Sequence, residues 1–247
     1  MNILARDKLI IALDVESARE ALDLFSRLRS FTNFFKIGSK LFTATGPQIV
    51  REIVALGGRV FLDLKFHDIP AVVAAAGVEA TRLGVSIFTV HAAGGGEMMR
   101  RTAEAISETA EREGLPRPRA IAVTVLTSMD DSTLYEVGIA SGIESQVRRL
   151  ARLAFESKLD GAVASPHEAG LVRETVHDRN FIIVAPGLRP AGVGHDDQRR
   201  VMTPANALRA GADYLVIGRA IINATNPEIA AQRIIEEMEQ EISLEPD

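Results

Sequence analysis

The chain contains no cysteine among its 247 residues. This absence excludes disulfides, a thiol nucleophile and cysteine-ligated metal sites. Long apolar runs are also missing: none reaches the roughly 18 residues that a membrane-spanning helix needs, and residues 1–8 lack the apolar core of a signal peptide. We therefore expect a cytoplasmic protein with no membrane partner.

Positive charge is scarce as well. Lys and Arg number 28 against 33 Asp and Glu, which gives a formal net charge of −5. No dense basic run compensates for this balance, so we expect no nucleic-acid partner. The hydrophobic content of 47% is ordinary for a globular domain, and no linker-like segment divides the chain. Any anionic ligand would have to be bound by local groups.

Short apolar segments alternate with amphipathic ones along the whole chain. The predicted strands are residues 8–14, 34–38, 59–65, 86–90, 119–126, 161–164, 181–185 and 214–217. The predicted helices are residues 18–28, 46–56, 69–83, 97–113, 144–157, 167–176, 204–210 and 227–242. Strict alternation predicts a parallel sheet, and eight units favour a closed (β/α)8 TIM barrel that forms a single domain over residues 1–247. An open doubly wound sheet is the alternative.

Polar residues recur where the predicted strands end. In a barrel the C-terminal strand ends form one rim, and that rim is the face on which active sites are built. The residues expected there are Asp14, Lys36, Asp63, Lys65, His91, Thr127, Ser165, Gly187, Arg189, Gly218 and Arg219. A ring of polar strand ends is harder to explain by packing than a single one, so the pattern predicts a site at this rim.

The most highly charged strand end is the run of residues 63–70, Asp-Leu-Lys-Phe-His-Asp-Ile-Pro. Alternation along a strand places Asp63 and Lys65 on one face, and Asp68 lies just past the strand end. Charges at a buried strand end are costly to desolvate unless each is paired. The spacing alone leaves a structural ion pair and a catalytic role both open.

The same rim also offers side chains that could bind a metal. Its potential ligands are Asp63, His67, Asp68 and His91. The ammonium groups of Lys36 and Lys65 would compete for the carboxylates, and no paired-histidine spacing occurs, so we expect no metal. We expect His67 to orient its loop, and His91 either to line the barrel mouth or to pack.

The last two strands predict a phosphate site. Gly218 would let backbone N–H groups approach an anion, and Arg219 could bind phosphate oxygens. The glycine-rich segment 187–203 follows the seventh strand and is expected to close as a lid that brings Arg189 and Gln198 to the anion. A turn glycine beside a surface arginine, and a loop without a role, are the alternatives.

Eight short motifs, spread from the first strand to the last, match one known family. They lie at residues 11–14, 35–38, 63–70, 90–95, 123–128, 186–189, 197–198 and 218–219. Through them the chain resembles the orotidine 5'-phosphate decarboxylases. The sparser pattern Asp-x-Lys-x-x-Asp is shared with related magnesium-dependent sugar-phosphate decarboxylases.

The resemblance implies cofactor-free conversion of orotidine 5'-monophosphate (OMP) to UMP and carbon dioxide, the last step of UMP synthesis. It implies that Lys65 protonates C6 of the ring while Lys36 and Asp63 hold it, and that Asp68 reaches the neighbouring active site of a homodimer. The substrate-binding residues that it implies are Asp14, Lys36, Thr127, Arg189, Gln198, Gly218 and Arg219.

One position departs from the family pattern. Val72 stands where the family commonly has threonine, so we expect substrate binding to be weaker by at most one hydrogen bond, about 1 kcal/mol. The sequence leaves two other functions open. One is a magnesium-dependent sugar-phosphate decarboxylase or another phosphate-binding barrel enzyme, and the other is a catalytically silent nucleotide-binding barrel.

Overall fold

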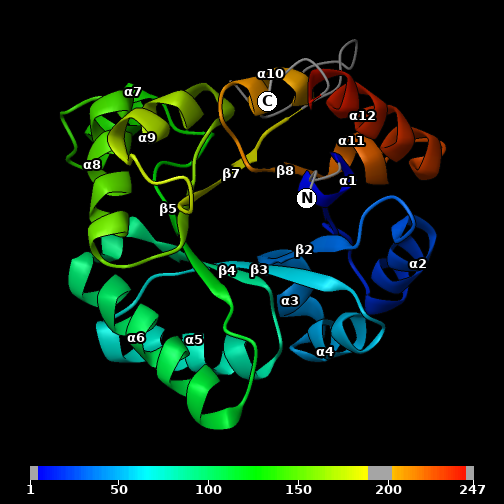
Figure 1. Cartoon of the computed structure of the whole chain (residues 1–247), viewed down its shortest axis with the longest axis horizontal. Coiled ribbons are helices and arrows are strands. Elements are labelled where there is room, and N and C mark those ends of the chain that lie inside the picture. Colours follow the sequence, from blue (N-terminus) through cyan, green and yellow to red (C-terminus); the bar gives the residue numbers. More distant parts are fainter. Residues whose placement is uncertain (1–4, 189–201, 243–247) are drawn as a thin grey trace.

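The protein is a closed barrel of parallel strands surrounded by helices (Figure 1). The computed structural model describes residues 5–188 and 202–242. The strands pair in chain order, and β8 closes the ring by pairing with β1. Their bounds are β1 Leu9–Ala12, β2 Phe34–Gly38, β3 Arg59–Phe66, β4 Ile87–His91, β5 Arg119–Val123, β6 Gly161–Val163, β7 Ile182–Pro186 and β8 Tyr214–Ile217. The predicted (β/α)8 TIM barrel is confirmed.

All eight predicted helical segments are present, with ends shifted by a few residues at most. They are α2 Ala18–Leu28, α4 Gln48–Ala55, α5 Pro70–Arg82, α6 Gly96–Glu113, α8 Ile143–Glu156, α9 Ala169–Thr175, α10 Pro204–Arg209 and α12 Pro227–Ile242. Their buried residues face the strands, as the apolar periodicity of the sequence requires. None of the helices in the described ranges is long and apolar enough to cross a bilayer.

The expected count of eight helices is too low for the described part of the chain. Four further helices occur, α1 Ala5–Lys8, α3 Ser39–Thr45, α7 Asp131–Glu136 and α11 Arg219–Ile222, with single 3-10 turns at Ala92–Gly94 and Pro166–Glu168. These segments are too short to show a helical period in the sequence. The start of α7 is instead stabilised by its N-cap, where the Asp130 carboxylate accepts a hydrogen bond from Thr133 N–H.

The inside of the barrel is filled by apolar side chains from alternate strand positions. The buried residues of this inner cluster are Ile10, Ala12, Phe34, Phe61, Ile87, Ile121, Val123, Val163, Ile182, Val184 and Val216. At the N-terminal strand ends the Arg59 guanidinium lies 4.1 Å from the Phe34 ring centroid, and Tyr214 packs edge-on to the same ring. Packed side chains therefore close this end, and the polar groups gather at the other.

The strand β3 is irregular where it reaches the polar end. Its register with β4 shifts: Leu62 pairs with Phe88, but Phe66 already pairs with Val90. The segment of β3 between these two pairs is therefore longer than the facing segment of β4. Lys65 lies in this bulge with φ 52°, in the left-handed region that residues other than glycine rarely adopt. The bulge re-aims the end of the strand without changing the predicted faces.

Candidate active site

Two aspartates and two lysines alternate at the ends of the first three strands. The Nζ atom of Lys36 lies 3.0 Å from Asp14 Oδ1 and 3.7 Å from Asp63 Oδ2. The Nζ atom of Lys65 lies 2.8 Å from the same Asp63 Oδ2. We call these four residues the rim network. Its central carboxylate, Asp63, is shared by two ammonium groups.

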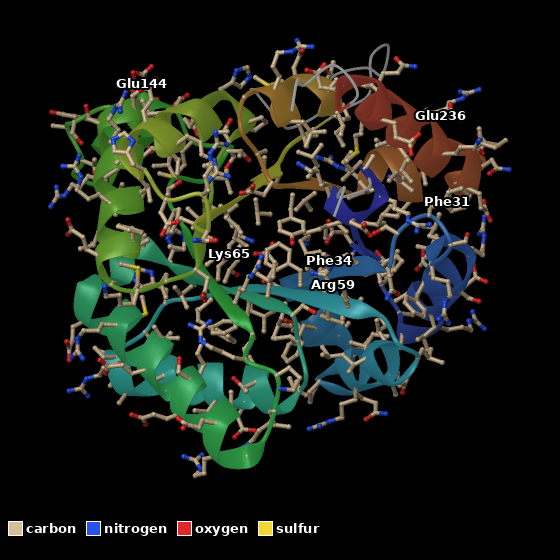
Figure 2. The ribbon with its side chains drawn as sticks, viewed as in Figure 1. Phe31, Phe34, Arg59, Lys65, Glu144 and Glu236 are labelled. Atoms are coloured by element: carbon tan, nitrogen blue, oxygen red, sulfur yellow. The ribbon has the colours of Figure 1, made fainter. Side chains whose placement is uncertain are left out.

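Burial is uneven across the rim network. The side chains of Lys36 and Asp63 are only 11% and 12% exposed, whereas that of Lys65 is 35% exposed. Attraction between charges is stronger away from water, so the buried pair of Lys36 and Asp63 holds the more accessible Lys65 in a fixed position. Figure 2 shows Lys65 near the middle of the ring of helices.

A cavity of about 160 Å³ opens beside this lysine. Its lining residues are Lys36, Phe61, Asp63, Lys65, Val123, Val125, Leu126, Thr127, Val163, Pro186 and Val216. Leu62, Leu64 and Phe66 instead pack against the core outside the barrel, so the predicted alternation along β3 is confirmed. The cavity combines apolar walls with ammonium groups along one side, which suits a flat ring on which negative charge develops.

Two glycines leave room for the rim network. A Cβ on Gly38 would lie 2.8 Å from Lys36 Nζ and 3.3 Å from Asp14 Oδ1. A Cβ on Gly218 would lie 3.2 Å from the Cβ of Ala12 and 3.5 Å from Asp14 Oδ2. Gly218 is therefore adjacent to the network, whereas Gly38 is a site residue that the sequence alone did not single out.

Thr89 is a second residue that the sequence did not single out. It lies in β4 and is fully buried. Its hydroxyl donates to Asp63 Oδ1 at 3.0 Å and accepts from the Lys65 backbone N–H at 2.8 Å. The available signal was a hydroxyl inside the otherwise apolar run of residues 87–90.

The two rim histidines stack on each other. The rings of His67 and His91 have centroids 5.5 Å apart and planes inclined by 30°. His91 Nδ1 is buried and has no hydrogen-bond partner among the described residues. Burial lowers the pKa of His91, and the nearby charges of His67 and Lys65 lower it further. Of the two alternatives for His91, its stacking on His67 supports packing, and His91 does not line this cavity.

The remaining predicted residues fall into separate groups. Asp68 is exposed and its Oδ1 accepts a hydrogen bond from Ile69 N–H at 2.6 Å. The structure gives it no bond to the rim network within this chain. Thr127 lines the cavity, as predicted, although β5 ends at Val123 and not at Leu126, so that Thr127 lies in the loop after the strand. Val72, where the family commonly has threonine, is exposed near the start of α5.

The predicted phosphate residues are only partly described. Gly218 caps α11, and Arg219 is its first residue. Arg189 and Gln198 lie outside the described residues, as does most of the predicted lid at 187–203. The structure therefore describes only the Gly218 and Arg219 side of the predicted phosphate site.

The rim carboxylates that could attract a metal cation already form ion pairs with lysine ammonium groups. Lys36 Nζ lies between Asp14 and Asp63, where a metal ion bound by both would have to lie. Within the described residues no three His, Asp or Glu side chains group as metal ligands would. The donor set present is that of an ammonium-centred site.

Comparison with known proteins identifies one family over nearly the whole chain. The model of the orotidine 5'-phosphate decarboxylase / HUMPS family matches residues 7–234. An orotidine 5'-phosphate decarboxylase of Syntrophotalea carbinolica is 52% identical over 239 residues, which are 96% of this chain and 97% of the relative. A relative of the same name from Moorella thermoacetica is 52% identical over 236 residues, 95% of this chain and 93% of its own.

Solved structures agree with the sequence relatives. The crystal structure of orotidine 5'-phosphate decarboxylase from Lactobacillus acidophilus superposes with a TM-score of 0.82 at 32% identity, covering 94% of this chain and 99% of that one. An uncharacterized conserved protein from Geobacillus kaustophilus superposes with a TM-score of 0.78 at 36% identity, over 93% and 99% of the two chains. The chain belongs to the orotidine 5'-phosphate decarboxylase / HUMPS family.

Proposed function

We propose that the chain converts OMP to UMP and carbon dioxide, with Lys65 as the acid. The observation that carries the assignment of Lys65 is its ammonium group, held 2.8 Å from Asp63 beside an apolar cavity. Family membership and relatives about 50% identical over nearly the full chain support the reaction itself. Pyrimidine nucleotide synthesis is the pathway that this reaction serves.

In the proposed reaction the bond between C6 and the carboxyl carbon breaks, and its electron pair stays on C6. The Lys65 ammonium stabilises that charge and then transfers one proton to C6, so that UMP and carbon dioxide are formed and Lys65 is left as an amine. Solvent returns the proton to Lys65 before the next turnover. Asp63 and Lys36 keep the ammonium in place. The lysine supplies both charge and proton, so the step calls for no metal or cofactor.

We assign the substrate contacts from the family resemblance, and the positions of the described residues around the cavity support them. We assign the ribose hydroxyls to Asp14 and Lys36, and the pyrimidine edge to Thr127, because these residues border the cavity or its network. The residues that we assign to the phosphate are Arg189, Gln198, Gly218 and Arg219. Because the phosphate lies far from the reacting carbon, its binding energy would serve to order the site for reaction.

We also propose that the active form is a homodimer in which Asp68 completes the partner's site. Asp68 is exposed and outside the rim network of its own chain. The large apolar side chains of Ile69 and Val72 are exposed beside it, which is typical of a surface that another chain covers.

Mixing two inactive variants tests this arrangement. In a heterodimer of Lys65→Ala and Asp68→Asn, one site receives both intact residues and the other receives neither. Random mixing should therefore restore about a quarter of wild-type activity, because half of the dimers are mixed and half of their sites are intact. Activity that stays at the level of the separate variants would contradict action across the dimer.

We further propose that residues 1–247 form a single domain of a cytoplasmic enzyme without nucleic-acid or membrane partners. The matched region, residues 7–234, spans almost all of the chain. The negative net charge of −5 supports the absence of a nucleic-acid partner.

The alternative, a magnesium-dependent sugar-phosphate decarboxylase, is not favoured, because Lys36 already bridges the carboxylates of Asp14 and Asp63. The two functions separate in one assay. Purified protein is incubated with OMP in the presence of EDTA, and the absorbance of the pyrimidine ring is followed, with Lys65→Ala as control. We expect full turnover in EDTA by the wild type and none above background by the variant. No absorbance change with wild-type protein would overturn the proposal.

A further inference from the structure

We infer that Thr89 is a positioning residue, whose hydroxyl fixes both the carboxylate of Asp63 and the backbone of Lys65 for the proposed decarboxylation. The inference rests on the proposed function for its effect on turnover. Thr89 lies in the strand next to β3 and is not among the residues that line the cavity. It would therefore act through the two residues that it holds.

The direction of the hydrogen bonds at this hydroxyl is fixed by its partners. A backbone N–H can only donate, so the Lys65 N–H uses the Thr89 oxygen as acceptor at 2.8 Å. The carboxylate of Asp63 accepts, so the single hydroxyl proton points to its Oδ1 at 3.0 Å. The other oxygen, Oδ2, is left for the ammonium groups of Lys65 and Lys36.

Lys65 needs such support more than other strand residues do. The register between β3 and β4 shifts between Leu62 and Phe66, and Lys65 adopts a positive φ within that interval. This conformation is unfavourable for a residue with a Cβ and persists only where its surroundings hold it. The hydroxyl of Thr89, on the facing strand, holds the backbone N–H at this point.

Thr89 itself has no freedom to move away. Its side chain is fully buried, so water cannot readily replace the hydroxyl once it is removed. Valine has nearly the shape of threonine without the oxygen. Thr89→Val would leave the Lys65 N–H and one Asp63 oxygen without this partner, while the cavity lining would keep its composition.

The test compares Thr89→Val with Thr89→Ser, which restores the hydroxyl, and with Thr102→Val as matched control. Thr102 is also fully buried and donates to a backbone carbonyl, that of Met98, but it lies within α6. We expect kcat to fall about 10- to 100-fold in Thr89→Val, because small displacements of a charged catalytic group are costly. KM and UMP affinity should change by less than about threefold, and Thr89→Ser and Thr102→Val should keep kcat within about threefold.

Several results would overturn the inference. These are a kcat within about twofold of wild type in Thr89→Val, an equal loss in Thr102→Val, or a Thr89→Ser variant as slow as Thr89→Val. If Thr89→Val fails to fold, Thr89→Ala removes the same hydroxyl and takes its place. A wild-type protein inactive on OMP would refute the proposed function separately. Thr89 would then be tested by a crystal structure of the valine variant, where an unchanged Asp63 carboxylate and Lys65 φ would overturn the inference.

Discussion

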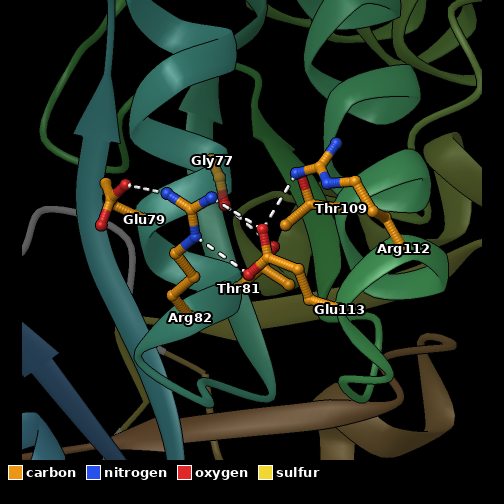
Figure 3. Close-up of polar contacts among 7 residues, drawn as sticks. All are labelled: Gly77, Glu79, Thr81, Arg82, Thr109, Arg112 and Glu113. Atoms are coloured by element: carbon orange, nitrogen blue, oxygen red, sulfur yellow. Dashed lines mark hydrogen bonds and ion pairs between the residues drawn. The ribbon is translucent and has the colours of Figure 1, made fainter.

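Two ion-pair networks in this molecule use similar groups at similar distances. In the rim network, Asp63 is shared by Lys36 and Lys65. On the outer surface, Arg82 of α5 bonds to Glu113 of α6 and to Glu79, and Glu113 also accepts from Arg112 (Figure 3). The shortest contacts are 2.8 Å in the first network and 2.7 Å in the second. Contact distance alone does not distinguish them.

What differs is the surroundings of the charges. The Arg82 side chain is 43% exposed, and its partners meet solvent rather than a cavity. The guanidinium of Arg82, followed by that of Arg112, lowers the pKa of Glu113 to about 2. Such exposed pairs contribute little to stability. The rim network instead has two buried charges, those of Lys36 and Asp63, beside a largely apolar cavity, and that combination indicates chemistry.

The comparison would be sharpened most by removing one cation from each network. Lys65→Ala should lower kcat by at least about 10⁴-fold, because both the proton donor and the stabilising charge are lost. UMP affinity should stay within about tenfold, because most substrate contacts remain. Arg82→Ala is the matched control and should leave kcat unchanged. A Lys65→Ala variant within about tenfold of wild type would remove the distinction between the networks.

A smaller effect should follow from crowding the rim network without removing a charge. In Gly38→Ala the new Cβ would press on Lys36 Nζ, 2.8 Å away, so the ammonium must move. We expect kcat/KM to fall about 10- to 100-fold with the fold retained. In the control Gly170→Ala, the nearest atom to the new Cβ is the Ala210 carbonyl oxygen at 3.7 Å, an ordinary contact. Equal kcat/KM in both variants would show that Lys36 tolerates displacement.

His91, which stacks on His67, should make the free energy of unfolding depend on pH. The pKa of His91 is lowered in the fold by burial, then by His67 and Lys65. As pH falls below the ordinary histidine value, the unfolded chain takes up a proton that folded His91 resists, so acid lowers the free energy of unfolding. Urea unfolding at pH 7.5 and 5.5 should show a smaller loss in His91→Gln than in wild type. The exposed His177 offers a control, and an equal loss in His91→Gln and His177→Gln would contradict this account.

The smallest effect should come from the outer network. Glu113→Gln should change the melting temperature by less than about 2 °C at pH 7, since exposed ion pairs contribute little. Decarboxylation should be unchanged. Calorimetry and the OMP assay check the two expectations. A large drop in melting temperature would mean that the surface pairs of α5 and α6 hold the barrel together more than their exposure implies.

The fold and the charged part of the site could be predicted because each depends on local pattern. Alternating apolar strands and amphipathic helices determine the barrel, and strand ends determine which residues reach its rim. Asp14, Lys36, Asp63 and Lys65 do meet there, as expected. The short helix α7 was not predicted, because it is stabilised by the cap at Asp130 and is too short to show a helical period of apolar residues.

Other features depend on contacts between strands and could not be predicted from the sequence. The left-handed backbone of Lys65 arises from a register shift against β4, whereas alternation along β3 looks regular. Thr89 reaches Asp63 across 26 positions of sequence, and Gly38 matters through the space beside Lys36. The proposed role of Asp68 depends on a second chain.

The central claim is that the Lys65 ammonium lies where it can stabilise and protonate C6 of the nucleotide. A crystal structure with bound UMP tests this claim most directly. We predict that Lys65 Nζ lies within about 3.5 Å of C6, with Asp63 still bonded to it. A separation beyond about 5 Å in an ordered complex would contradict the account, because neither charge stabilisation nor direct proton transfer could then come from this lysine.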